Sequence, residues 1–204
     1  MGFSGSMRPD LAVVGLIGPT NLVRIARASG VPAELYQECA FEAGAAIARH
    51  NAILAVVPDR GVALDGFRGY TGAHGPWSIG LVPDGGPSDS VATSNCRRGG
   101  EECDEIIDGF TWHHQHAALC QLSDLMICVG LSCGTIAEIA WTKWVGGPRV
   151  VALRQTFTAI PQEILAETDV IMIDDLGSLD DALRRELEGV RDKTSISGKR
   201  KSKP

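Results

Sequence analysis

LMICVGLSCGTIAE, residues 125–138, is the stretch that decides the fold of this chain. Its first five residues are apolar, which predicts a strand buried inside a parallel sheet. Small residues follow and predict a turn, and the next segment continues in a helical pattern through Trp141. Thr135 suits the start of that helix. A strand that leads through a short turn into a helix is the building unit of α/β proteins.

The same turn predicts a site for an anion. The first N–H groups of a helix have no partner within the helix, and the helix dipole favours a negative charge beside them. We expect a phosphate on the N–H groups of residues 132–135, and Glu138, one turn later, near the rest of the ligand. The alternative is a turn without a ligand, with Glu138 favoured there by the dipole alone. The turn residues predicted to bind the ligand are Gly130, Ser132, Cys133, Gly134 and Thr135.

The rest of the chain alternates predicted strands with predicted helices. Residues 84–109, rich in Gly, Ser, Asp and charge, are expected to form a long loop that leaves room for a short strand at 105–107. The alternation predicts an α/β fold with a Rossmann-like, open, mostly parallel sheet and helices on both faces. The other strands are expected at 11–18, 52–57, 77–83, 149–153 and 170–173, and the other helices at 32–50, 62–72, 111–123, 161–167 and 178–187, the last capped by Ser178.

The length of 204 residues fits a single domain with a sizeable core. We expect a flexible N-terminus at 1–10 and a Rossmann-like ligand-binding domain at 11–188. Residues 189–204 are rich in Lys and Ser and lack apolar periodicity, which predicts a disordered basic tail.

Ligands of open α/β sheets bind beyond the carboxyl ends of the strands. The segments after the strands that end near Gly18, Pro58, Pro83 and Gly130 are therefore expected to gather at one edge. Arg60 is positioned to reach a phosphate there, although an ordinary solvated loop is the alternative. A second predicted segment would close over the rest of the ligand, unless it is a plain turn; its residues are Gly18, Pro19, Thr20 and Asn21.

Three histidines precede the strand at 125–129. His113, His116 and Cys120 are spaced to share one helix face, and imidazole and thiolate are good zinc ligands. Because three ligands on one helix rarely complete a tetrahedron, we expect no metal, and we expect His113, Gln115 and His116 to line the pocket. Cys133 lies at a helix start, where a thiol pKa falls, but we expect it to be a small filler residue rather than a nucleophile.

The composition excludes several classes of protein. The net charge of −6 argues against nucleic acid as the main partner, and no apolar run is long enough to cross a membrane. No signal peptide opens the chain, and the six cysteines form no CxxC pair. We expect a reduced, cytoplasmic protein that does not contact membranes.

The chain resembles the Rossmann-like, lysine decarboxylase-like superfamily, which includes the LOG phosphoribohydrolases and the molybdenum cofactor carrier proteins. The LOG signature Pro-Gly-Gly-x-Gly-Thr-x-x-Glu matches at residues 130–138, and the carrier-like branch matches more closely in residues 128–135, CVGLSCGT. Residues 15–19, GLIGP, match its opening Gly-x-x-Gly-Pro turn, and residues 80–83, GLVP, match its Gly-Ile-Leu-Pro strand. The resemblance covers residues 11–187.

The resemblance implies a phosphorylated, nucleotide-like ligand and a homodimer or larger homo-oligomer. LOG enzymes carry a catalytic Arg in a Met-His-Glu-Arg-Lys segment, and Gln115 takes its place in Trp112-His113-His114-Gln115-His116. We therefore expect a carrier or binding protein, for a nucleotide or for molybdenum cofactor as cargo. The alternative is a LOG-like hydrolase of nucleoside 5′-monophosphates, in which Glu138 is catalytic.

Overall fold

Seven parallel strands form the core of the protein. The computed structural model describes residues 10–85 and 90–201, and in these the strands follow the order β4-β3-β2-β1-β5-β6-β7. Nearly every residue of the central strands is buried on both faces, as expected of apolar runs in a parallel sheet. The bounds are β1 Val13–Ile17, β2 Ile53–Val56, β3 Ser78–Leu81, β4 Glu105–Ile107, β5 Leu125–Cys128, β6 Arg149–Leu153 and β7 Val170–Ile173.

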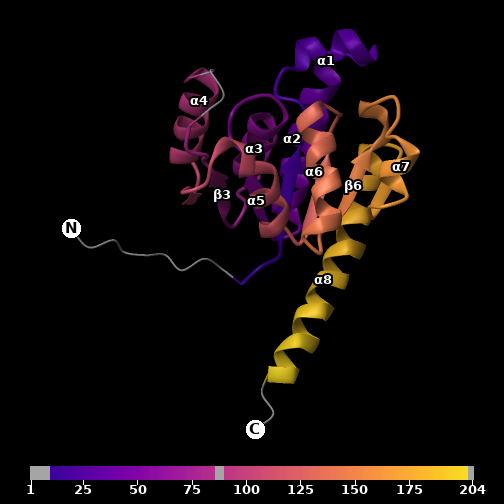
Figure 1. Cartoon of the computed structure of the whole chain (residues 1–204). Coiled ribbons are helices and arrows are strands. Elements are labelled where there is room, and N and C mark those ends of the chain that lie inside the picture. Colours follow the sequence, from indigo (N-terminus) through magenta and orange to yellow (C-terminus); the bar gives the residue numbers. More distant parts are fainter. Residues whose placement is uncertain (1–9, 86–89, 202–204) are drawn as a thin grey trace, which may run out of the picture.

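Helices cover both faces of this sheet (Figure 1). On one face α2, α3 and α8 bury apolar side chains against the strands, and α5, α6 and α7 do so on the other. The fold is thus the predicted α/β Rossmann-like open sheet. The helices are α1 Leu22–Ser29, α2 Ala33–Arg49, α3 Val62–Gly72, α4 Ser90–Glu101, α5 Gln115–Leu122, α6 Cys133–Trp144, α7 Gln162–Leu165 and α8 Leu179–Lys201, with single 3-10 turns η1 Trp112–His114, η2 Arg154–Thr156 and η3 Leu176–Ser178.

Two helices that the sequence analysis did not predict lie near the edge where the strands end. The segment 84–109 is not a long loop, since it contains α4 as well as the short strand β4. Burial of Ala92 and Cys96 holds α4 on the sheet although its composition is polar. The 18–21 turn leads directly into α1, whose N-cap is Asn21: its side chain accepts from the Arg24 N–H at 3.1 Å.

The C-terminal helix also differs from the expectation. Ser178 is not its cap, because it closes η3, where the Asp175 side chain accepts from the Ser178 N–H at 3.1 Å. Helix α8 continues to Lys201, through most of the segment predicted to be a disordered tail, since no proline interrupts it before Pro204. Residues 1–9 of the predicted flexible N-terminus lie outside the described part. Among the described residues, no helix has the length and apolarity needed to span a membrane.

Helices α2 and α3 approach each other through glycines. A Cβ on Gly44 would run into the backbone carbonyl of Gly66, and one on Gly69 would run into that of Phe41. Backbone cannot move aside as a flexible side chain can. This close contact brings α3, and the loop that precedes it, firmly against the α2 face of the sheet.

We predict that Gly44→Ala lowers the free energy of unfolding by roughly 1–3 kcal/mol, the usual cost of overpacking a core. Chemical denaturation followed by circular dichroism measures the change. Gly72→Ala is the matched control, since the nearest atom to its Cβ would be the tip of Phe41 at 4.0 Å. Equal stability of the two variants would contradict the role assigned to the glycine contact.

Candidate functional site

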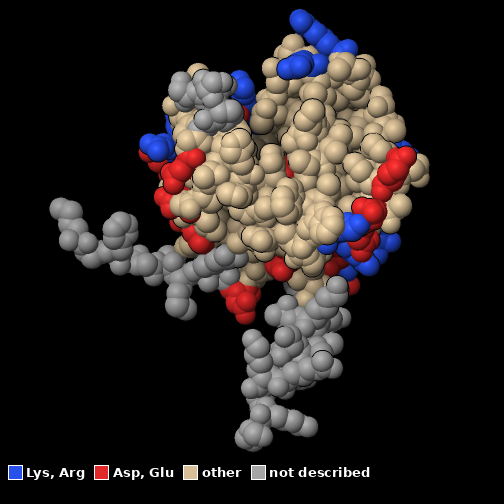
Figure 2. Space-filling view, in the orientation of Figure 1, with Lys and Arg blue, Asp and Glu red and all other residues tan. Residues whose placement is uncertain are grey.

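A cavity of about 300 Å³ opens at the carboxyl edge of the sheet, beside β1 and β5. The chain leaves β1 toward the α2 face and leaves β5 toward the α6 face, so the two connections diverge and a crevice remains between them. Figure 2 shows the hollow, bounded largely by uncharged surface, between the parts of the molecule that carry α4 and α1. Its volume lies at the lower end of the range for small-molecule sites.

One end of the cavity is the start of α6. The N-cap is Ser132, not Thr135: its hydroxyl accepts from the Thr135 N–H at 3.2 Å and lies 2.9 Å from the Thr135 hydroxyl. The expected phosphate site therefore loses the Thr135 N–H. The N–H group of Gly134 has no acceptor within the described part of the chain. This amide and the two hydroxyls are what this end offers to an anion.

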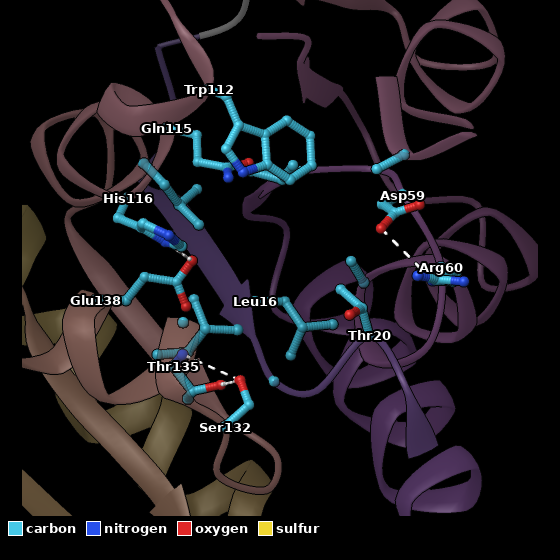
Figure 3. Close-up of a pocket in the computed structure, with 17 residues that line it drawn as sticks. Leu16, Thr20, Asp59, Arg60, Trp112, Gln115, His116, Ser132, Thr135 and Glu138 are labelled. Carbon is cyan, nitrogen blue, oxygen red and sulfur yellow. Dashed lines mark hydrogen bonds and ion pairs between the residues drawn. The ribbon is translucent and has the colours of Figure 1, made fainter. Parts of the chain in front are cut away.

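A buried carboxylate and an imidazole form the second wall. Nδ1 of His116, on α5, lies 3.1 Å from Oε1 of Glu138, on α6, and Glu138 is only 8% exposed (Figure 3). Hydrogen bonding to Glu138 raises the pKa of His116, against the effect of its burial. Burial raises the pKa of Glu138, and the His116 hydrogen bond only partly offsets this. Both shifts favour the protonated forms, so the pair keeps its protons to higher pH than either group would in water.

The opposite wall comes from the loop after β2. Asp59 is 7% exposed, and its Oδ1 accepts from Asn95 Nδ2 of α4 at 3.0 Å. Arg60 Nε lies 3.7 Å from Asp59 Oδ2, and the Arg60 side chain is about half exposed at the rim. Figure 3 shows Asp59 and Arg60 across the cavity from Glu138. Thr20 lies between this pair and Ser132. This wall thus offers a ligand one hydrogen-bond acceptor, the Asp59 carboxylate, and one positive charge, the Arg60 guanidinium.

The end of the cavity away from Ser132 is formed by Trp112 and Gln115 (Figure 3). Trp112 is partly buried and lies in η1, and Gln115 is the first residue of α5. Apolar side chains of β1, α3, α4 and α5 line the space between the polar groups; they are Leu16, Ile17, Ala63, Ala92 and Leu119.

The structure brings most of the predicted residues into this cavity and leaves others outside it. Those that line it are Gly18, Thr20, Arg60, Gln115, His116, Ser132, Gly134, Thr135 and Glu138. The predicted residues that do not line it are Pro19, Asn21, His113, Gly130 and Cys133. Sequence reasoning did not select Asp59 or Trp112. Asp59 had a usable signal, since it follows a buried strand at the ligand edge, whereas nothing in the sequence placed Trp112 opposite the start of α6.

The residues outside the cavity have structural roles or face solvent. Gly130 has φ of +81°, a conformation that favours glycine, and donates its N–H to Thr156 Oγ1 at 2.8 Å. Pro19 is buried and its carbonyl accepts from the Val62 N–H at 3.1 Å. Cys133 and His113 are exposed.

The spacing of His113, His116 and Cys120 does not produce a metal cluster. His116 pairs with Glu138, and Cys120 donates its S–H to the Glu138 carbonyl at 3.2 Å. In residues 10–85 and 90–201, no three His, Cys, Asp or Glu side chains are grouped so as to hold a metal ion.

A seven-stranded parallel sheet with a polar crevice beyond the ends of β1 and β5 defines the class of Rossmann-like α/β domains. The sequence matches the model of the SLOG cluster4 family over residues 12–178. The chain therefore belongs to the SLOG cluster4 family, which agrees with the LOG-like resemblance of its motifs. No curated protein matches the chain.

Solved structures share this fold at low sequence identity. The Moco carrier protein of Chlamydomonas reinhardtii is 21% identical with a TM-score of 0.63, over 88% of this chain and 99% of that one. The molybdenum cofactor binding protein of the phototrophic bacterium Rippkaea orientalis is 17% identical with a TM-score of 0.62, over 88% and 98%. DNA processing protein A of Helicobacter pylori, described in its single-stranded DNA binding mode, is 14% identical with a TM-score of 0.59, over 86% and 81%. These likenesses establish the fold.

We predict that His116 titrates above its ordinary pKa of 6.5 and that Glu138→Gln lowers this pKa, because the carboxylate no longer stabilises the imidazolium. NMR titration of the histidine ring signals measures the change. Glu101→Gln, at an exposed position at the end of α4, is the control and should leave His116 unchanged.

The same pair sets a pH dependence of stability. A raised folded pKa means that the contribution of His116 is complete below pH 6.5 and is lost as the pH rises through the folded pKa. We expect the unfolding free energy to fall over that interval, because the hydrogen bond to the Glu138 carboxylate no longer holds an imidazolium. A wild-type protein whose unfolding free energy rises across this interval would contradict the assignment.

Proposed function

We propose that this protein binds a phosphorylated, nucleotide-like small molecule, with the phosphate at the start of α6. The observation that carries the proposal is the arrangement of the cavity, which places Ser132, Gly134 and Thr135 beside the His116–Glu138 pair. The free Gly134 amide, two hydroxyls and a helix dipole together favour a phosphate over a neutral group.

His116 supplies charge to this end of the cavity when protonated. A Cβ on Gly134 would lie 3.2 Å from Cε1 and 4.0 Å from Nε2 of His116, so the imidazole lies directly beside the α6 turn. Because Nδ1 faces Glu138, the other ring nitrogen is left to face the anion. The imidazolium then provides the positive charge that is lost where Gln115 takes the place of the LOG arginine.

Binding without chemistry, as in a carrier, is the first form of this proposal. Relatives in fold include a Moco carrier protein and a molybdenum cofactor binding protein. Molybdenum cofactor, which combines a pterin with a phosphate, is accordingly one candidate cargo, and a nucleotide is the other. A carrier requires a pocket that holds its ligand intact. Holding either of these cargoes does not require the catalytic Arg of the LOG enzymes.

Hydrolysis of a nucleoside 5′-monophosphate is the second candidate, and the buried Glu138 favours it. In that reaction the bond between C1′ and the base breaks, the base leaves with the bonding electrons and a proton, and water adds to C1′. Glu138 would stabilise the oxocarbenium-like sugar or position the water. The products would be free base and ribose 5-phosphate.

We predict that AMP or GMP binds with one molecule per chain and that the corresponding nucleosides bind at least tenfold more weakly, because they lack the phosphate. Isothermal titration calorimetry measures both. Arg60→Gln should weaken AMP binding by roughly threefold to tenfold, the worth of one hydrogen bond, whereas Arg184→Gln, on the surface of α8, should have no effect. Affinity should fall as the pH rises through the raised pKa of His116.

Chromatography of the same mixtures separates the two candidates. Intact nucleotide supports the carrier, and released base that disappears in Glu138→Gln supports the hydrolase. Equal binding of nucleotide and nucleoside would overturn the phosphate site itself.

We also propose that the protein forms a homo-oligomer through α6. Trp141 and Trp144 are 41% and 73% exposed and line a shallow apolar depression with Ala137 and Ala140. Exposed apolar patches of this kind mark protein contacts. We predict a dimer or larger species in sedimentation velocity, shifted toward monomer by Trp144→Glu and unaffected by Val23→Glu, an exposed apolar position on α1.

A further inference from the structure

Trp112 presents an aromatic surface at the end of the cavity away from the α6 turn (Figure 3). No hydrogen bond of its indole N–H is formed within the described part of the chain. The apolar side chains Leu16 and Leu119 line the same cavity. An indole at the wall of a cavity suits a flat ligand ring.

The backbone that carries Trp112 is held in place. The Asp84 N–H donates to the Phe110 carbonyl at 2.7 Å, and Asp84 and Thr111 form an isolated parallel bridge. The Thr111 hydroxyl lies 2.9 Å from Nδ1 of His114, which closes the η1 turn. The backbone at Trp112 is therefore tied to the segment that follows β3.

Gln115 adds a second, independent feature. Its side chain lines the cavity and the residue is only 5% exposed, yet its amide forms no hydrogen bond with the described residues. Its amide atoms are not among the fully buried, unpaired polar atoms, so the amide is accessible and free to bond water or a ligand in the cavity. An amide presents a donor and an acceptor next to each other, which matches the edge of a nitrogen heterocycle.

We propose that Trp112 and Gln115 form the subsite for a planar nitrogen heterocycle, with the indole stacked on the ring and the Gln115 amide bonded to its edge. The proposal rests on the phosphate site at the start of α6 and deepens it. The ligand then spans the cavity, with its phosphate at Ser132 and its heterocycle at Trp112. Its middle part lies between Glu138 and Asp59, where carboxylates can accept from sugar or other hydroxyl groups.

Calorimetry with AMP and with ribose 5-phosphate tests this subsite, since only AMP carries a ring. We predict that AMP binds more tightly in the wild type and that Trp112→Leu weakens AMP roughly tenfold to hundredfold, the usual effect of losing a stacking partner. Ribose 5-phosphate should be unaffected within about twofold, and Trp112→Phe should retain most of the affinity for AMP. Trp144→Leu, outside the cavity, is the control.

Gln115→Leu separates ligand recognition from a structural role. Because it replaces an amide that has no hydrogen bond among the described residues with an apolar group of similar size, unfolding stability should be kept. AMP binding should weaken roughly threefold to tenfold. Lower stability with unchanged AMP affinity would overturn the role of Gln115.

Fluorescence provides a direct readout of stacking. AMP should quench tryptophan emission in the wild type and not in Trp112→Phe, whereas ribose 5-phosphate should quench neither. Trp77 donates to Glu105 at the opposite edge of the sheet, and Trp141 and Trp144 lie on the outer face of α6, so they do not report on the cavity. GMP and the phosphate ester of 6-hydroxymethylpterin, used in the same titrations, distinguish a purine from a pterin, and preference for either over ribose 5-phosphate supports the subsite.

Two failures have different meanings. Equal affinity for AMP and ribose 5-phosphate, insensitive to Trp112→Leu, overturns the heterocycle subsite and leaves the phosphate site intact. No binding of any of the phosphorylated probes overturns the phosphate site and the subsite with it.

Discussion

The pairing of β1 with β5 is the constraint on which the site depends. These strands are neighbours in the sheet although more than a hundred residues separate them, and their carboxyl ends lie at the same edge. The chain then turns to opposite faces, toward α2 from β1 and toward α6 from β5. Gly18 makes the junction possible, since a Cβ there would meet the Val129 carbonyl. The crevice exists because these connections cannot fill the space they leave behind.

Around that crevice, each wall comes from a different element and contributes a different kind of group. The start of α6 offers N–H and hydroxyl donors, the β2 loop offers Asp59 and Arg60, and the α5 region offers Trp112, Gln115 and His116. The buried Glu138 joins two of these walls through His116. This distribution of donors, charges and an aromatic ring suits an elongated ligand with a phosphate at one end and a flat ring at the other.

The sequence analysis worked best where one local pattern specified both structure and position. Continuous apolar runs predicted the strands, and the order of strands and helices led to the parallel sheet. It failed at α4, where polar residues and glycines predicted a loop: the helix is held by contacts with distant segments, including the packing of Gly99 against Pro58. It did not identify the cap of α6, because both Ser132 and Thr135 are suitable residues and only the backbone geometry selects Ser132.

The sequence by itself determined the fold class, the turn before α6 and most of the residues that follow a strand at the ligand edge, because each of these depends on neighbours along the chain. Only the tertiary structure decided which side chains face one another across the cavity. His116 and Glu138 are 22 residues apart, and Asp59 and Asn95 are 36 residues apart. Trp112 lies opposite Ser132 because the bridge at Asp84 fixes η1 to β3. Such distances are set by the packing of whole elements, which periodicity and spacing along the chain do not contain.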